Sequence, residues 1–142
     1  RGQDLPAEAF FARSLAANRT VNALNNLAWL LQKRGEYGKA EEYVREALRM
    51  DAGIAQTWDT LGVILMKTGR QHEAKEAFER SLELSDENVN VKLHLAELHI
   101  AMGEASEAEK VLRRLTRIKE TLSSDDAETL VALSKSLKKL QR

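Results

Sequence analysis

Residues 58–78 read WDTLGVILMKTGRQHEAKEAF, and their spacing predicts two helices joined by a short turn. Apolar side chains recur at steps of three and four within residues 58–65, which places them on one face of a helix. Gly69 follows at the end of that helix, where the backbone often needs a positive φ. Ala74 and Phe78 are four residues apart and begin the apolar face of a second helix. The stretch therefore predicts a helix–turn–helix unit.

The same unit occurs three times in the chain, at an interval of 34 residues. Three columns keep this register: Gly35, Gly69 and Gly103 in the turn, Leu27, Leu61 and Leu95 in the first helix, and Ala40, Ala74 and Ala108 in the second. Self-similarity at a fixed period of this length is the signature of a repeat architecture. A single hairpin cannot bury its apolar face alone, so we expect the units to stack.

The unit resembles the tetratricopeptide repeat, which has the pattern Trp-x-x-Leu-Gly-x-x-Tyr, then Ala-x-x-x-Phe, then proline. The residues that carry the resemblance are Trp58, Leu61, Gly62, Ala74 and Phe78 in the second copy, Leu24, Leu27, Ala28, Ala40 and Val44 in the first, and Leu95, Ala96, Ala108 and Leu112 in the third. In the second copy, Leu65 replaces the aromatic residue and Asp86 replaces the proline. The resemblance implies an all-α fold, a right-handed superhelical α-solenoid of stacked helix–turn–helix repeats.

We predict one domain over residues 1–142. Its expected parts are the second helix of a preceding repeat at 5–20, full repeats at 21–54, 55–88 and 89–122, and a capping helix at 123–142. The helix at 5–20 lacks its partner, so we expect an apolar face around Phe10 and Phe11 that another copy or upstream sequence covers. Ser124 or Asp125 is the expected N-cap of the capping helix.

Composition excludes several classes of protein. The 22 basic and 22 acidic residues give a formal net charge of zero, whereas nucleic-acid binders normally carry a basic excess. Cysteine is absent, which excludes disulfides and a thiolate nucleophile. No apolar run approaches the roughly 20 residues that a membrane-spanning helix needs. We therefore expect neither a nucleic-acid partner nor membrane insertion.

In tetratricopeptide arrays the first helix of each unit lines a concave groove, which is the usual ligand surface. By this resemblance the candidate ligand-binding residues are Asn22, Asn25, Asn26, Trp29, Lys33, Gln56, Asp59, Val63, Lys67, Asn90, His94 and Glu97. Asparagine and glutamine carry both donors and acceptors, so they can pair with the backbone of an extended peptide. Three asparagines within one helix run against helix propensity, which favours a binding role. Simple solvation of these polar side chains is the alternative.

Trp29 is the strongest single candidate for a contact with a ligand in this groove. A tryptophan flanked by amides would form a hot spot for a partner. The alternative is a packed ring that covers the junction with the preceding helix. Trp58, by contrast, stands at the structural tryptophan of the repeat, and we expect it in the core.

The sequence offers no catalytic, metal or cofactor site. His94 and His99 are five residues apart, which does not align them on one helix face, and Glu97 is the one further ligand candidate nearby. Phosphate loops and dinucleotide glycine motifs are absent. Most acidic residues fit surface pairing, as with Glu76 and Arg80 four apart.

The leading hypothesis is a non-catalytic module that binds a peptide or partner segment in its concave groove. One alternative is the targeting or scaffold region of a larger enzyme or of a secretion or polysaccharide-export protein. Another is self-assembly, through the open N-terminal end or the C-terminal helix.

Overall fold

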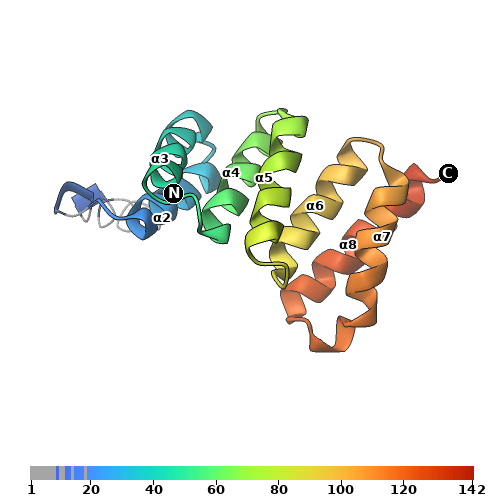
Figure 1. Ribbon diagram of the computed structural model, residues 1–142. Helices are drawn as coiled ribbons and strands as arrows, with labels where there is room; N and C mark the ends of the chain where they lie inside the picture. Colours follow the sequence, from blue (N-terminus) through green and yellow to red (C-terminus); the bar gives the residue numbers. More distant parts are fainter. Residues whose placement is uncertain (1–8, 10–11, 14, 18) are drawn as a thin grey trace. The chain divides into compact units, whose positions relative to one another are not determined.

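The computed structural model describes residues 9, 12–13, 15–17 and 19–142. In these residues the chain forms α-helices and one 3₁₀ turn, with no strand (Figure 1). This result confirms the predicted all-α fold. The helix expected at 5–20, with Phe10 and Phe11, lies largely outside the described residues. The chain forms two compact units, residues 1–84 and 85–142.

The first unit contains two helical hairpins. Their helices are α2 (Val21–Lys33), α3 (Tyr37–Met50), α4 (Ala55–Lys67) and α5 (Gln71–Leu84). Within this unit α2 packs on α3 and α4 on α5, and α4 also contacts both α3 and α2 (Figure 1). The two first helices, α2 and α4, are thus neighbours, as stacked repeats require.

Small residues hold the helices of the first unit close together. Ala28, Ala40 and Ala74 are fully buried. Gly62 lies directly against Phe78, because a Cβ added at Gly62 would stand 2.4 Å from Cε1 of the Phe78 ring. That separation is below van der Waals contact, so only glycine fits at this point of α4 while Phe78 keeps its place.

The three turn glycines end their helices in one recurring motif. Gly35, Gly69 and Gly103 have φ values of 80°, 81° and 77°. After each glycine, the next backbone N–H donates to a carbonyl five residues earlier; for example, Glu36 N lies 2.9 Å from Leu31 O. The glycine N–H itself donates three residues back. This is the Schellman motif, which satisfies helix-end carbonyls and needs a left-handed residue, most easily glycine.

The second unit contains one hairpin and one further helix. Its elements are α6 (Val89–Ala101), α7 (Ala105–Arg117), a 3₁₀ turn η1 (Lys119–Thr121) and α8 (Ser124–Leu140). The Ser123 side chain caps α8 by accepting from Asp126 N–H at 3.1 Å. The cap is therefore one residue earlier than the predicted Ser124, because Ser123 has the extended backbone that an N-cap requires.

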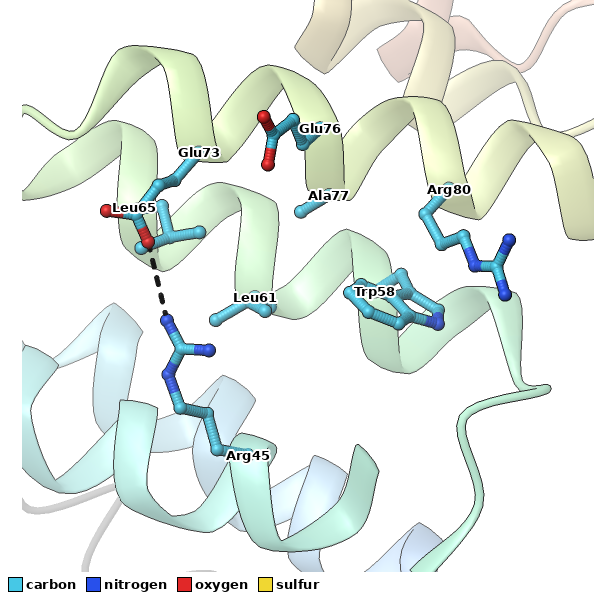
Figure 2. Close-up of a pocket in the computed structure, with 8 residues that line it drawn as sticks. All are labelled: Arg45, Trp58, Leu61, Leu65, Glu73, Glu76, Ala77 and Arg80. Atoms are coloured by element: carbon cyan, nitrogen blue, oxygen red, sulfur yellow. Dashed lines mark ion pairs between the residues drawn. The ribbon is translucent and has the colours of Figure 1, made fainter. Parts of the chain in front are cut away.

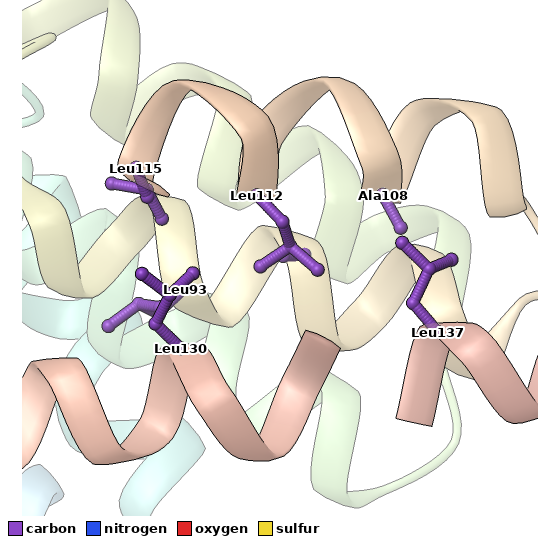
Figure 3. Packing of buried hydrophobic residues seen from close by; sticks show 7 residues of the cluster. Leu93, Ala108, Leu112, Leu115, Leu130 and Leu137 are labelled. Carbon is purple, nitrogen blue, oxygen red and sulfur yellow. The ribbon is translucent and has the colours of Figure 1, made fainter. Parts of the chain in front are cut away.

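Leucines from α8 complete the core of the second unit. The core residues are Leu93, Ala96, Ala108, Leu112, Leu115, Leu130 and Leu137. In Figure 3, Leu130 points toward Leu93 and Leu115, while Leu137 points toward Ala108. The helix α8 thus packs on the apolar faces of both α6 and α7.

Candidate functional site

Four of the predicted groove residues form one exposed stripe on α2. Asn22, Asn26, Trp29 and Lys33 follow one another at steps of four, three and four, so they share one helix face. All four are exposed. Trp29 keeps 37% of its surface open, which makes it one of the exposed large apolar residues of the chain. The ring is therefore available to a partner in this structure.

The Trp29 ring is held beside a positive charge. The Lys33 ammonium lies 6.0 Å from the centre of the ring, one helical turn further along α2. A cation at this distance is attracted by the negative face of the indole. The pair presents an apolar surface and a positive charge side by side.

Three other predicted residues are buried beneath the exposed positions. Asn25, Asp59 and Val63 keep 5%, 9% and 4% of their surface. Asn25 Oδ1 is buried and accepts no hydrogen bond from the residues that the structure describes. A buried amide oxygen without a donor costs free energy. Asn25 is therefore a packed position between neighbouring helices rather than an open position of the groove.

The corresponding stripe on α4 is exposed only at its ends. Gln56 and Lys67 are exposed, whereas Thr60 and Val63 between them are buried. The Thr60 hydroxyl donates to the backbone carbonyl of Gln56 at 3.1 Å, so this donor is not available to a ligand. The contact surface offered by α4 is therefore polar and interrupted.

The second unit carries the remaining predicted residues on α6. Asn90 and Glu97 are exposed, and His94 is half-buried. Leu93, which stands in the column of Asn25 and Asp59, belongs to the core beneath α8. The capping helix thus explains why this column is apolar in the last repeat.

Trp58 lines a pocket that the sequence did not reveal (Figure 2). The indole is half-buried, and its Nε1–H donates to the carbonyl of Ala52 at 2.8 Å, which fixes the loop before α4. The pocket has a volume of about 270 Å³. Its lining comprises Trp58, Leu61, Leu65 and Ala77 together with the charged residues Arg45, Glu73, Glu76 and Arg80. Trp58 is therefore only partly in the core where we expected it.

Two of the four charged residues around this pocket form an ion pair with each other. The Arg45 guanidinium lies 3.7 Å from the Glu73 carboxylate, across the pocket from α3 to α5 (Figure 2). Arg80 donates to Glu83 at 3.0 Å, so the expected pair between Glu76 and Arg80 is replaced by a pair one turn later. The pocket consequently has no strong excess of either charge.

A second hollow, lined by α7, η1 and α8, also went unpredicted. Its volume is about 230 Å³. The lining residues are Thr116, Lys119, Leu130, Val131, Ser134, Lys135 and Lys138. The lysine-rich outer faces of the last helix were a visible signal, but the sequence did not show that Lys119 joins them.

Glu41 carries the most extensive hydrogen bonding among the carboxylates of the first unit. Arg70 donates to both of its oxygens, with Nη1 3.1 Å from Oε2, and Arg45 Nε donates to Oε2 at 2.8 Å. These bonds, from Arg70 first and then Arg45, hold the pKa of Glu41 below its ordinary value despite partial burial. The network joins α3 to the turn before α5.

The structure gathers no group of three or more His, Asp or Glu side chains suited to a metal within the residues it describes. Nor is any helix in this part of the chain both long and apolar enough to cross a bilayer.

Comparisons with known proteins agree on the repeat family. Two models described as tetratricopeptide repeat match residues 20–50 and 65–133. The human protein O-mannosyl-transferase TMTC3 is 32% identical over 109 residues, which are 76% of this chain and 12% of that protein. Human tetratricopeptide repeat protein 7B is 32% identical over 85 residues, which are 59% of this chain and 10% of that protein.

A solved structure shows the same fold. The crystal structure of MamA matches with a TM-score of 0.74 at 18% identity, over 99% of this chain and 90% of that one. The chain spans only about a tenth of the two curated relatives. The repeat fold is typically non-catalytic and suggests a module for protein–protein interaction. Because family models match residues 20–50 and 65–133 and the helices form repeated hairpins, this chain belongs to the tetratricopeptide repeat family.

Proposed function

We propose that this chain is a non-catalytic binding module that holds an extended peptide segment of a partner protein against the exposed face of α2. The single observation that carries the proposal is the stripe of exposed amides around a tryptophan that is 37% exposed. Scattered apolar surface residues are ordinary, but a tryptophan set among side-chain amides has the composition of a binding hot spot.

Each residue of the stripe has a distinct role in this proposal. The amides of Asn22 and Asn26 donate to and accept from the peptide backbone, which gives affinity with little side-chain preference. Trp29 supplies the apolar anchor, and Lys33 favours a carboxylate beside it. Gln56 and Lys67 extend the contact surface onto α4, which packs against α2. Asn90, His94 and Glu97 form a separate polar face on α6 in the second unit, and this proposal does not depend on it.

The test begins with peptides selected from a random library against the wild-type chain. Trp29→Ala should weaken the selected peptides by more than ~1 kcal/mol, which is roughly a five-fold change in dissociation constant. Lys139→Ala is the control, because Lys139 is exposed on α8 and outside the stripe. The side-chain amide resonances of Asn22 and Asn26 should shift on titration. Equal binding by wild type and the Trp29 variant, at matched thermal stability, would reject the proposal.

A second candidate function is suggested by the resemblance to TMTC3, which is named as a protein O-mannosyl-transferase. In this proposal the repeats are the targeting region of a larger enzyme and hold its protein substrate. The test is to express the complete gene product with and without residues 21–122 and to assay mannosyl transfer to protein. Loss of substrate choice without loss of transfer to a short acceptor would support a targeting role, and unchanged transfer to protein substrates would exclude it.

A further inference from the structure

The hollow between α7 and α8 combines an apolar floor with a positive rim. Leu130 lines the hollow and is 2% exposed, since its side chain packs in the core of the unit (Figure 3). Val131 beside it is 41% exposed, although it is a large aliphatic residue. An apolar surface left open within a hollow gains free energy when a partner side chain covers it.

Three lysines surround this floor without any acidic counterpart. Lys119 comes from η1, and Lys135 and Lys138 lie one turn apart on α8; all three are exposed. No carboxylate is among the lining residues. In the part of the chain that the structure describes, none of the three lysines forms an ion pair, whereas Lys110 on α7 pairs with Glu107. No lining carboxylate and no direct ion pair within the described residues therefore neutralises these three ammonium groups.

The hydroxyl groups in the hollow cannot add donors for a ligand. The Thr116 hydroxyl donates to Leu112 O at 2.8 Å, and the Ser134 hydroxyl donates to Leu130 O at 2.8 Å. The donors that remain are ammonium groups on flexible stems, which act as point charges rather than as a fixed fork for phosphate. Carboxylates at adjustable spacing around an aliphatic group suit these features best. The volume of about 230 Å³ is below that of typical small-molecule pockets, so it fits a side chain.

We propose that this hollow is a second docking site, which binds an acidic amphipathic segment of a partner protein. An aliphatic side chain of the segment rests on Val131 and Leu130. Flanking glutamates or aspartates pair with Lys119, Lys135 and Lys138. The site lies on the second unit and uses none of the residues proposed for the α2 stripe, so either site can fail in a test without the other.

The probe is a synthetic peptide with one leucine flanked on each side by two glutamates, titrated against the whole chain at low and physiological salt. Lys135→Gln with Lys138→Gln should weaken binding by roughly ten-fold, as expected when two exposed ion pairs are lost. The matched control is Lys139→Gln with Arg142→Gln, which removes the same charge at the same end of α8 but outside the hollow. Val131→Ser should weaken the leucine peptide, and a peptide with serine in place of leucine should bind poorly to every chain.

The result expected is binding that falls with added salt, that the paired lysine variant loses and the control variant keeps, and that shifts the Val131 methyl resonances. Equal loss in both double variants would overturn the proposal, since it would show attraction by overall charge. Equal binding of the leucine and serine peptides would also overturn it, because the floor would then play no part. Binding of phosphatidylserine vesicles but not of the peptide would overturn it in favour of a membrane surface. Trp29→Ala should leave this binding unchanged.

Discussion

Gly62 and Phe78 are matched to each other in size. The Phe78 ring is fully buried and occupies the space where a Cβ of residue 62 would lie. In the other two repeats the same pair of columns holds Ala28 with Val44 and Ala96 with Leu112. A larger residue on the first helix thus accompanies a smaller one on the second, as close packing at a fixed helix separation requires.

This matching predicts a non-additive pair of substitutions. Gly62→Ala alone should destabilise the first unit by about 1–3 kcal/mol, because the added methyl forces the Phe78 ring to move. Combining it with Phe78→Leu should recover part of that loss. The double-mutant cycle needs the wild type, the two single variants and the double variant. Urea denaturation followed by tryptophan fluorescence measures each of them, since both tryptophans lie in the first unit. Strictly additive free energies of unfolding would show that the two positions do not compete for space.

His99 occupies a core column that is otherwise leucine. Leu31 and Leu65 stand at the equivalent positions and are fully buried. His99 is 4% exposed, and its Nδ1 is buried without a hydrogen bond to any described residue. The nearest carboxylate oxygen, Glu104 Oε1, is 3.7 Å away, beyond hydrogen-bond distance. In this Schellman turn, a histidine and a glutamate replace the apolar contact that usually accompanies the motif.

Replacing this histidine should stabilise the protein. His99→Leu removes a buried ring nitrogen that has no hydrogen bond to a described residue, so we expect a gain of about 1 kcal/mol in the free energy of unfolding. The reverse change at an equivalent column, Leu65→His, should be destabilising. Thermal melts followed by circular dichroism measure both variants. A lower melting temperature for His99→Leu would show that the imidazole forms an interaction that stabilises the fold.

At the level of helices, the ion pair between Glu41 and Arg70 links two consecutive repeats. Glu41 lies on α3, whereas Arg70 directly follows the turn glycine between α4 and α5. Arg70 is therefore held by its backbone in the Schellman motif and by its side chain on the preceding repeat. A backbone already fixed by a turn loses less entropy when its side chain forms an ion pair.

This bridge predicts a specific dependence of stability on pH. The pKa of Glu41 is lowered in the folded chain, mainly by its hydrogen bonds from Arg70. Its contribution is therefore fully present above its ordinary pKa and is lost as the pH falls through the lowered folded value. Glu41→Gln should cost about 1 kcal/mol or less near neutral pH, since Arg70 is 38% exposed and solvent screens the pair.

Urea midpoints of the wild type and Glu41→Gln, measured from neutral to acidic pH, test this expectation. The two curves should converge on acidification. Glu42→Gln, at the exposed neighbouring position on α3, is the control and should follow the wild type. A difference between wild type and Glu41→Gln that persists at the acidic end would mean that the glutamate acts through packing rather than through its charge.

At the scale of the whole molecule, the second unit needs α8 to complete its hydrophobic core. The core there draws Leu93 from α6, Leu112 and Leu115 from α7, and Leu130 and Leu137 from α8. Without α8, the leucines of α6 and α7 would face solvent. A helix that is apolar on one side and polar on the other can cover such a stack and present its polar side to water.

Removal of α8 should therefore loosen α6 and α7. A chain ending at Leu122 should show faster amide hydrogen exchange throughout both helices, because the local opening free energy falls when buried apolar contacts are lost. A chain ending at Leu140 keeps α8 and is the control. Unchanged protection of α6 and α7 after the larger deletion would show that the hairpin holds its structure without the cap.

Local patterns account for the parts of the fold that the sequence predicted correctly. The 34-residue register placed the turn glycines, and each was found at the left-handed position of a Schellman motif. Helix faces follow from steps of three and four, so the sequence alone predicts the apolar face that holds Ala74 and Phe78. These features depend on residues within one repeat and its copy, which lie close in the sequence and repeat at a fixed interval.

Which candidate residues are exposed depends instead on how neighbouring helices pack, and the 34-residue period does not specify that packing. Asn25, Asp59 and Val63 are predicted groove residues, yet neighbouring helices bury them. The indole of Trp58 is left half-buried beside a pocket that only the packing of α3, α4 and α5 creates. Lys119 meets Lys135 and Lys138 because α8 folds back on α7. The sequence thus determined which faces are apolar, and tertiary packing determined which remain open, because a side chain is covered by whatever element lies opposite it.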